Sequence, residues 1–249
     1  GVERMGDDSP EADAEILAMT VECLLTAGLT EFQVSVGQVD YYKAIFAQTG
    51  MSQEEEEELR ELISQKNYFG VEELVKSKKM DKSLAKVLSQ LPQMFGSAEV
   101  LEKAKALTDN PQALKAVARL EEIYELLKVY GYEKYITFDF AMLSKYHYYT
   151  GVIFKAFSYG VGDAIVKGGR YDKLLGCFGK SAPAIGFAVV IDDLLLSLER
   201  QNGTYQEKPV VQKITYTESN YTEKLKTAQA LRSEGKRVAL IPESERTEV

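Results

Sequence analysis

The chain has little of the residues from which many catalytic centres are built. Its 249 residues include no tryptophan, one histidine and two cysteines. A histidine-based metal cluster or a Ser-His-Asp triad would depend on His147 alone, so we predict no metal site and no such triad. Cys23 and Cys177 are far apart in the sequence and form no Cys-x-x-Cys pair. The simplest interpretation is two buried free thiols in a reducing cytoplasm.

Positive charge is also scarce. Lys and Arg total 30 against 38 Asp and Glu, which gives a formal net charge of −8. This balance argues against a general nucleic-acid binder, which needs a basic surface to displace counterions from phosphate. No apolar run approaches the ~20 residues that span a bilayer, and no signal peptide opens the chain. We therefore expect no membrane association.

Both ends of the chain look as if they were cut from a longer protein. Gly1-Val2-Glu3 has no initiator Met and resembles the middle of a strand. The last residues, Glu-Arg-Thr-Glu-Val, follow no clear closing element. We therefore expect further sequence on either side.

The first half of the chain is mainly helical in pattern. Ser9-Pro10-Glu11 indicates a helix start, with Ser as the N-cap and Pro in the first turn. Phe32 to Val36 alternates like a short strand. Ser52 and Glu55 have the spacing of a capping box. The stretch from about 51 to 130 has no convincing strand, and we predict that it is a helical insertion.

Strand patterns dominate the second half up to a helix predicted from Ile191 to about Gln201. Short turns between successive strands favour an antiparallel sheet with helices on one face. Gly168-Gly169 is expected at the end of one of these strands, where backbone can approach a ligand closely. The predicted strands are 136–140, 152–157, 163–166 and 186–190.

A linker at Asn202-Gly203 and Pro209 divides the chain. Residues 210–216, 219–234 and 237–240 beyond it form a β-α-β pattern. We therefore predict an α+β fold with a main domain at 1–202 and a partial C-terminal segment at 203–249.

Two short motifs carry most of the functional information. Gly168-Gly169-Arg170-Tyr171-Asp172 is compatible with a ligand site, and equally with a tight turn closed by an Arg170–Asp172 ion pair. Tyr148-Tyr149-Thr150-Gly151 precedes a strand, so one tyrosine can line a pocket while the other packs in the core. Taken alone, each motif is a weak signal.

The order of these motifs, followed by Gly186-Phe187-Ala188, makes residues 1 to about 200 resemble the catalytic domain of histidine-specific class II aminoacyl-tRNA synthetases. The resemblance implies an antiparallel class II sheet flanked by helices. It assigns Glu3 to the ammonium group of histidine, the tyrosine pair to its ring and Gly168-Gly169 to the pocket floor. Arg170, Tyr171 and Asp172 would support the wall. The expected histidine pocket comprises Glu3, Tyr148, Tyr149, Gly168, Gly169, Arg170, Tyr171 and Gly186.

Two positions depart from the active synthetases. The family usually has arginine where this chain has Ser144, and a second arginine against the ATP where this chain has Asp193. A carboxylate facing a triphosphate repels it, whereas adenylation needs cations to offset developing negative charge. We therefore predict that this chain does not activate histidine and has no catalytic residues or cofactor.

A class II domain with this pocket and without those cations resembles the regulatory subunits of short-form ATP phosphoribosyltransferases. That family acts in the first step of histidine biosynthesis. The resemblance implies a homodimer within a hetero-oligomer with the catalytic subunit, required for its activity and for feedback inhibition by histidine.

Two alternatives remain open at this point. One is a divergent histidine–tRNA ligase fragment, and the other is a pseudo-synthetase interaction module. Two further questions are also open. His147 either lines the pocket or packs beside the tyrosine pair, and the regulatory histidine binds either in this pocket or at a subunit interface.

Overall fold

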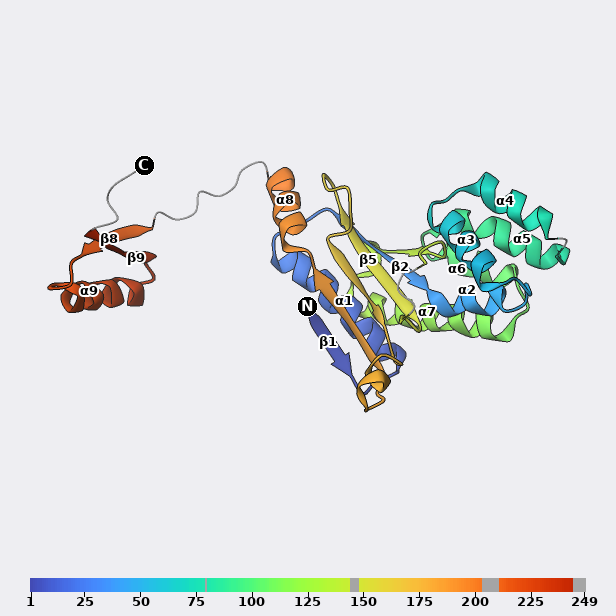
Figure 1. The fold of residues 1–249 in the computed structure, drawn as a ribbon, viewed down its shortest axis with the longest axis horizontal. Helices are drawn as coiled ribbons and strands as arrows, with labels where there is room; N and C mark the ends of the chain where they lie inside the picture. The colour runs from blue at the N-terminus through green and yellow to red at the C-terminus, as the bar shows by residue number, and fades with distance from the viewer. Residues whose placement is uncertain (79, 144–147, 203–210, 244–249) are drawn as a thin grey trace. The chain divides into compact units, whose positions relative to one another are not determined.

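The computed structural model describes residues 1–78, 80–143, 148–202 and 211–243. Ser144 and His147, both singled out in the sequence, lie outside the described residues. The chain divides into two compact units, Gly1–Gln201 and Asn202–Val249 (Figure 1). Each unit is described by itself.

A seven-stranded sheet forms the centre of the first unit, in the order β1-β7-β6-β5-β2-β4-β3. All neighbouring strands are antiparallel except the parallel pair β2 and β4. The antiparallel sheet predicted from the sequence is thus present, with one parallel pair that the pattern did not reveal. The strands are β1 (Val2–Met5), β2 (Phe32–Gln38), β3 (Phe95–Gly96), β4 (Ile136–Asp139), β5 (Val152–Ser158), β6 (Val166–Arg170) and β7 (Ala184–Val189).

The helices begin where local chemistry favours a helix start. The Ser9 hydroxyl accepts a hydrogen bond from the Ala12 amide at 3.2 Å, and Ser52 and Glu55 form the predicted capping box. Such caps satisfy amide groups that the helix itself leaves unbonded. The α-helices are α1 (Pro10–Thr26), α2 (Val39–Phe46), α3 (Gln53–Ser64), α4 (Tyr68–Ser77), α5 (Lys82–Gln90), α6 (Glu99–Ala106), α7 (Pro111–Tyr130) and α8 (Ile191–Asn202), and the 3₁₀ turns are η1 (Leu91–Gln93), η2 (Glu133–Tyr135) and η3 (Leu175–Phe178).

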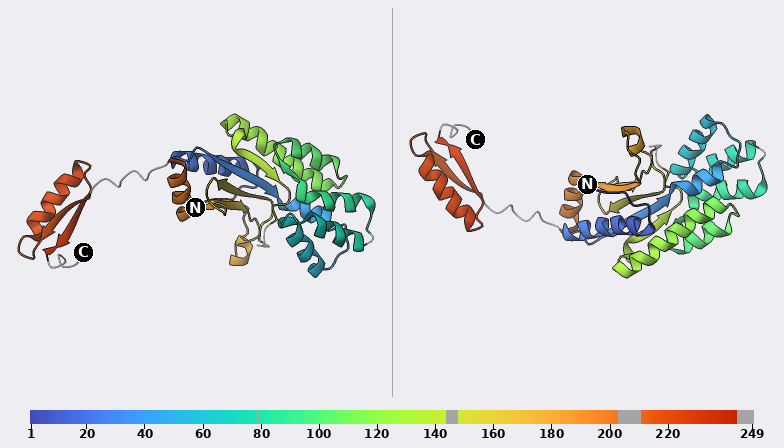
Figure 2. Two further views of the ribbon diagram at one scale, coloured as in Figure 1. Left: turned by 90° about the horizontal axis from the view of Figure 1, so that it is seen from above. Right: turned by 90° about the horizontal axis from the view of Figure 1, so that it is seen from below.

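Helices α1 and α7 pack against each other and cover one face of the sheet (Figure 2). Val36, Phe154 and Phe187 come from one cross-strand row on this face and are at most 2% exposed. Burial of each such side chain contributes roughly 2 kcal/mol to stability. This packing fixes the sheet so that its other face can carry a site.

Helices α3 to α6 gather at the end of the sheet where α2 follows β2 (Figure 1). The predicted stretch without strands contains the two-residue β3, which pairs with β4 and is too short to leave a periodic signal. Helix α7 contacts α1, α2 and β2, so this last helix of the predicted insertion lies in the layer that covers the sheet.

The second unit is a β-α-β segment. Strands β8 (Gln212–Tyr216) and β9 (Val238–Pro242) are parallel, and α9 (Tyr221–Ser233) connects them. Ala228 of α9 is fully buried. The predicted sequence of strand, helix and strand is confirmed.

Two further expectations can be compared with the structure. Cys23 and Cys177 are both exposed free thiols, so the prediction that they are buried is wrong. Cys23 lies on the outward side of α1 beside exposed Glu22, and Cys177 lies in η3. Across the described ranges, no helix is long and apolar enough to cross a membrane.

Candidate functional site

The open face of the sheet carries a row of residues with little or no side chain. Through the strand register, Glu3 of β1 lies beside Gly186, which lies beside Gly169, Ile153 and then Gly37. Three of these five positions are glycine, and they belong to β7, β6 and β2. Because no side chain rises from them, the row leaves a shallow floor across the sheet.

Neighbouring side chains fill the space that a larger residue would take on this floor. A Cβ atom at Gly169 would lie 2.6 Å from Cε1 of the Tyr149 ring, and one at Gly186 would overlap the Glu3 carboxylate. Tyr149 and Glu3 therefore lie directly on the glycine backbone. Both contacts require glycine, which explains why these positions tolerate no Cβ.

Three tyrosines form one wall above the floor. The rings of Tyr148 and Tyr149 are 4.5 Å apart at their centroids, with an interplanar angle of 42°. Tyr148 also meets Tyr171 edge to face, with centroids 6.3 Å apart. Lys43 donates from Nζ to the Tyr149 carbonyl oxygen at 3.1 Å, which helps to hold the segment in place.

Glu3 completes this arrangement with a negative charge. The Tyr171 hydroxyl donates to its Oε2 atom. Partial burial raises the pKa of the Glu3 carboxyl above its ordinary value. An ammonium group placed against Glu3 would offset this loss of hydration. The aromatic wall would accommodate a flat ring beside it.

Arg170 lies on the other face of the sheet. It is 2% exposed, and its Nε donates to Asp13 Oδ1 of α1 at 2.8 Å. Asp13 also accepts from Arg119 Nε at 2.6 Å. The expectation that Arg170 lines the pocket is wrong, because alternation along β6 turns it toward α1. Its ion pair with Asp172, at 3.0 Å, is confirmed.

Gly168 likewise differs from the expectation. It lies inside β6 rather than at a strand end, and a Cβ there would overlap the ring of Phe154 on the core face. Its backbone borders the cavity described next. The structure therefore brings together Glu3, Tyr148, Tyr149, Gly169, Tyr171 and Gly186, but it places Gly168 and Arg170 toward the core.

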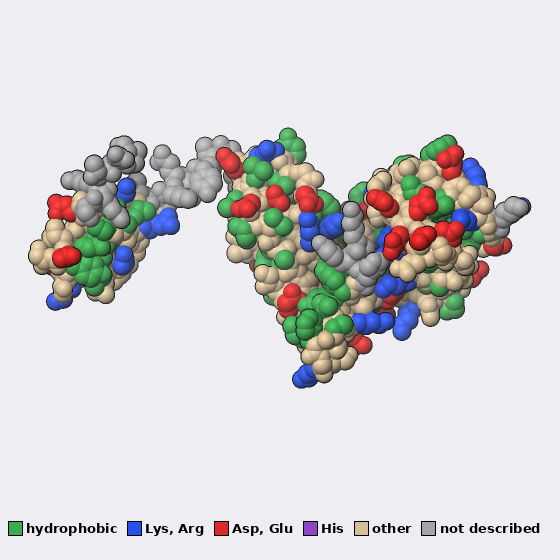
Figure 3. Space-filling model, viewed as in Figure 1, with side chains coloured by type: hydrophobic (Ala, Val, Ile, Leu, Met, Phe, Trp, Pro, Cys, Tyr) green, Lys and Arg blue, Asp and Glu red, His purple; other side chains and the backbone are tan. Residues whose placement is uncertain are grey.

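A cavity of about 800 Å³ extends from Tyr149 along the open face toward α3. Blue Lys and Arg side chains and red Asp and Glu side chains both border the hollow between the strands and the helices of the first unit (Figure 3). Its volume falls within the range typical of small-molecule sites. It is lined by Glu57, Arg60, Glu61, Ser64, Gln65, Met142, Leu143, Tyr149, Ile153, Phe154, Lys155, Lys167 and Gly168.

Sequence reasoning did not identify Gly37, Lys155 or Lys167. A single glycine in a strand and scattered lysines give no local signal. Only the pairing of β2, β5 and β6 brings these residues to one face. The alternation of side chains along each strand could have shown that Gly169 and Tyr171 share a face and that Gly168 and Arg170 share the other.

Asp193 lies in the first turn of α8 and is partly exposed. It has no ion pair with any residue that the structure describes. Within these same residues, no group of three or more His, Cys, Asp or Glu could hold a metal ion.

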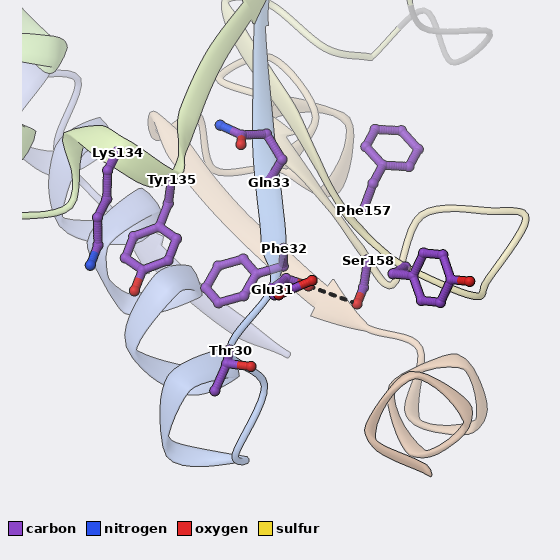
Figure 4. Close-up of a pocket in the computed structure, with 9 residues that line it drawn as sticks. Thr30, Glu31, Phe32, Gln33, Lys134, Tyr135, Phe157 and Ser158 are labelled. Atoms are coloured by element: carbon purple, nitrogen blue, oxygen red, sulfur yellow. Dashed lines mark hydrogen bonds between the residues drawn. The ribbon is translucent and has the colours of Figure 1, made fainter. Parts of the chain in front are cut away.

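A second cavity, of about 510 Å³, lies at the far ends of β2 and β5 (Figure 4). Phe32 and Tyr135 stack there with centroids 4.7 Å apart, and the Ser158 hydroxyl donates to the Glu31 carbonyl at 3.0 Å. The groove shares none of its lining residues with the glycine-floored site.

Comparison with known proteins places the chain among class II synthetase-like folds. The family model described as "Histidyl-tRNA synthetase" matches residues 1–194. A protein of Thermoanaerobacter pseudethanolicus named "ATP phosphoribosyltransferase regulatory subunit" is 41% identical over 96% of this chain and 63% of its own length. A similarly named relative in Acetivibrio thermocellus is 37% identical over 94% of this chain and 56% of its own length.

A solved structure from Bacillus halodurans, titled "ATP phosphoribosyltransferase regulatory subunit/histidyl-tRNA synthetase", has a TM-score of 0.80 at 31% identity. The match includes 99% of this chain and 63% of the length of the Bacillus halodurans protein. The chain thus spans less than two thirds of each of these relatives. The predicted class II synthetase-like α+β fold is confirmed.

Proposed function

The chain belongs to the histidyl-tRNA synthetase family, and on that premise we propose that it is a non-catalytic regulatory subunit of a short-form ATP phosphoribosyltransferase. In this proposal it acts in the cytoplasm, in the first step of histidine biosynthesis. It forms a homodimer within a hetero-oligomer with the catalytic subunit, which it activates. Free histidine is its ligand and the feedback signal.

The observation that carries this proposal is the glycine floor beneath Glu3 and the tyrosine wall. In the proposed complex, the histidine ammonium group lies against Glu3, and its ring contacts Tyr148 and Tyr149. Gly169 and Gly186 let Tyr149 and Glu3 lie directly on the sheet backbone, and these two side chains face the proposed ligand. The relatives named as regulatory subunits support the proposed role in an ATP phosphoribosyltransferase.

Charge supports the absence of ligase activity. The resemblance to active synthetases puts Asp193 where an arginine would face ATP. At about 4 Å and an effective dielectric constant of about 20, two unit charges interact by about 4 kcal/mol. Replacing a cation by a carboxylate turns an attraction of that order into a repulsion, which opposes nucleotide binding in a productive position.

Reconstitution tests the proposal. The full-length protein is mixed with the short catalytic subunit from the same organism, and phosphoribosyl transfer is measured with and without histidine. We expect activation by the protein and inhibition by histidine. In a Glu3→Gln variant, activation should remain while inhibition needs at least tenfold more histidine. Lack of activation by the wild-type protein would refute the proposed role.

The family match also favours one rival, a divergent histidine–tRNA ligase. That rival requires ATP–pyrophosphate exchange dependent on histidine. We expect the full-length protein to show no exchange above a blank without enzyme. Measurable exchange by the wild-type protein would favour the ligase if an Asp193→Arg variant shows no higher exchange.

A further inference from the structure

Lys155 and Lys167 face each other across β5 and β6 on the open face of the sheet. Lys155 lies opposite Lys167, two residues along each strand from the pair of Ile153 and Gly169. Two residues of a strand cover about 7 Å, and side chains two apart share a face. The lysine pair therefore lies one step along the sheet from the glycine floor, and both lysines line the 800 Å³ cavity.

This pairing has no evident structural benefit. Like charges directly opposite each other on neighbouring strands destabilise a sheet. Lys167 has one carboxylate partner, Asp163 at 2.7 Å, but the two side chains are 46% and 67% exposed. An ion pair so exposed contributes little. Within the described ranges, Lys155 has no ion pair. An anion between the two lysines would convert their repulsion into attraction.

Histidine carries one such anion, its α-carboxylate, which is bonded to the same carbon as the ammonium group. Among the residues that the structure describes, the glycine-floored site offers Glu3 for the ammonium group but no cation for the carboxylate. Arg170 is buried against Asp13, and Arg4 pairs with Asp7 at 2.8 Å and also with Glu15. Arg60 pairs with Glu56 at 2.6 Å. Lys155 and Lys167 line the cavity beside the floor, and in the described part of the chain Lys155 has no ion pair while Lys167 has only the exposed one with Asp163.

We propose that Lys155 and Lys167 bind the α-carboxylate of the amino acid whose ammonium group lies against Glu3. This inference rests on the proposed histidine pocket and specifies how that pocket distinguishes an amino acid from its amine. The ring lies at the tyrosine wall, and the carboxylate points along β5 and β6 into the cavity. Selectivity then comes from two opposite charges, Glu3 for the ammonium group and the lysine pair for the carboxylate.

Calorimetric titration of the full-length protein with histidine and with histamine tests this assignment, since histamine has the ring and the ammonium group but no carboxylate. We expect the wild type to bind histidine at least 30-fold more tightly than histamine. In the Lys155→Met/Lys167→Met double variant, histidine affinity should fall at least tenfold while histamine affinity is unchanged. Lys103→Met, at an exposed position on α6, is the matched control.

The outcomes separate the two levels of the proposal. If the wild type binds histidine and the double variant keeps the same histidine-to-histamine ratio, the lysine assignment is overturned while the histidine pocket stands. If the wild type binds no histidine, both fail. Equal loss of both ligands also overturns the assignment. The charge-conserving Lys155→Arg/Lys167→Arg variant should retain most of the selectivity, and unchanged histamine affinity in the Met double variant excludes unfolding as the cause of its weaker histidine binding.

A titration with AMP distinguishes a phosphate site from a carboxylate site. If AMP binds through the lysine pair and histidine binding does not depend on it, the assignment is wrong. We expect instead that AMP does not bind through the lysine pair, so that the double variant and the wild type give the same result with AMP.

Discussion

Replacing Arg170 by Met tests the buried ion pair that holds β6 against α1. The Arg170 guanidinium contacts Asp13 at 2.6 Å and 2.8 Å, and Asp172 at 3.0 Å. Asp13 is fully buried. Removing one partner of a buried pair costs about 3–5 kcal/mol, because the remaining charge stays buried. Arg119 still pairs with Asp13, so we expect the lower end, about 3 kcal/mol.

Urea unfolding followed by circular dichroism measures this loss. In thermal unfolding of a unit of about 200 residues, followed by the same signal, 1 kcal/mol shifts the melting temperature by about 2–4 °C, so a drop of roughly 6–12 °C is expected. Arg119→Met is the control. Its side chain is 26% exposed, and it should cost about 1–2 kcal/mol. A loss below 1 kcal/mol for Arg170→Met would refute the argument that this contact anchors β6.

Three further predictions concern the site and the helix starts. Gly169→Ala places a Cβ 2.6 Å from the Tyr149 ring, and overpacking of this kind typically costs about 1–3 kcal/mol. Histidine binding measured by calorimetry should therefore weaken at least tenfold. Gly162→Ala, whose Cβ meets nothing within 4 Å, should leave histidine affinity unchanged. Burial raises the pKa of Glu3, and an ammonium ligand needs the ionised carboxylate, so histidine affinity should begin to fall on acidification at a pH above the ordinary carboxyl pKa of 4.5. Glu3→Gln should remove this loss of affinity in the same titration. A pH profile that stays the same in this variant would contradict the assignment. Ser52→Ala removes the capping box of α3 and should lower stability by about 1 kcal/mol in thermal unfolding.

Features set by local chemistry were predictable from the sequence. Ser9 and Ser52 cap their helices as expected, and the helix at Ile191 begins where predicted. The tyrosine pair is an exception, because the two rings lie against each other where strand alternation predicted opposite faces. Neighbouring residues decide such features, so a short stretch of sequence contains the information.

Features set by pairing between distant strands were not predictable in the same way. Gly37 joins the floor only because β2 lies beside β5, and Lys155 meets Lys167 only through the register of β5 and β6. The low strand propensity of Gly168 and Gly169 concealed that β6 continues through them. The error on Arg170 followed, because its face depends on where that strand begins.

The position of Glu3 on β1 ties the charge of the site to the alignment of that strand. In the part of the chain that the structure describes, β1 lies at the edge of the sheet and pairs with β7, with Glu3 opposite Gly186. A slip of β1 by one residue would exchange its two faces. Arg4 would then stand over Gly186, and Glu3 would turn toward the acidic Asp13. A misaligned β1 would thus present a cation where the ligand brings one, and the correct register of this strand becomes a condition for recognition.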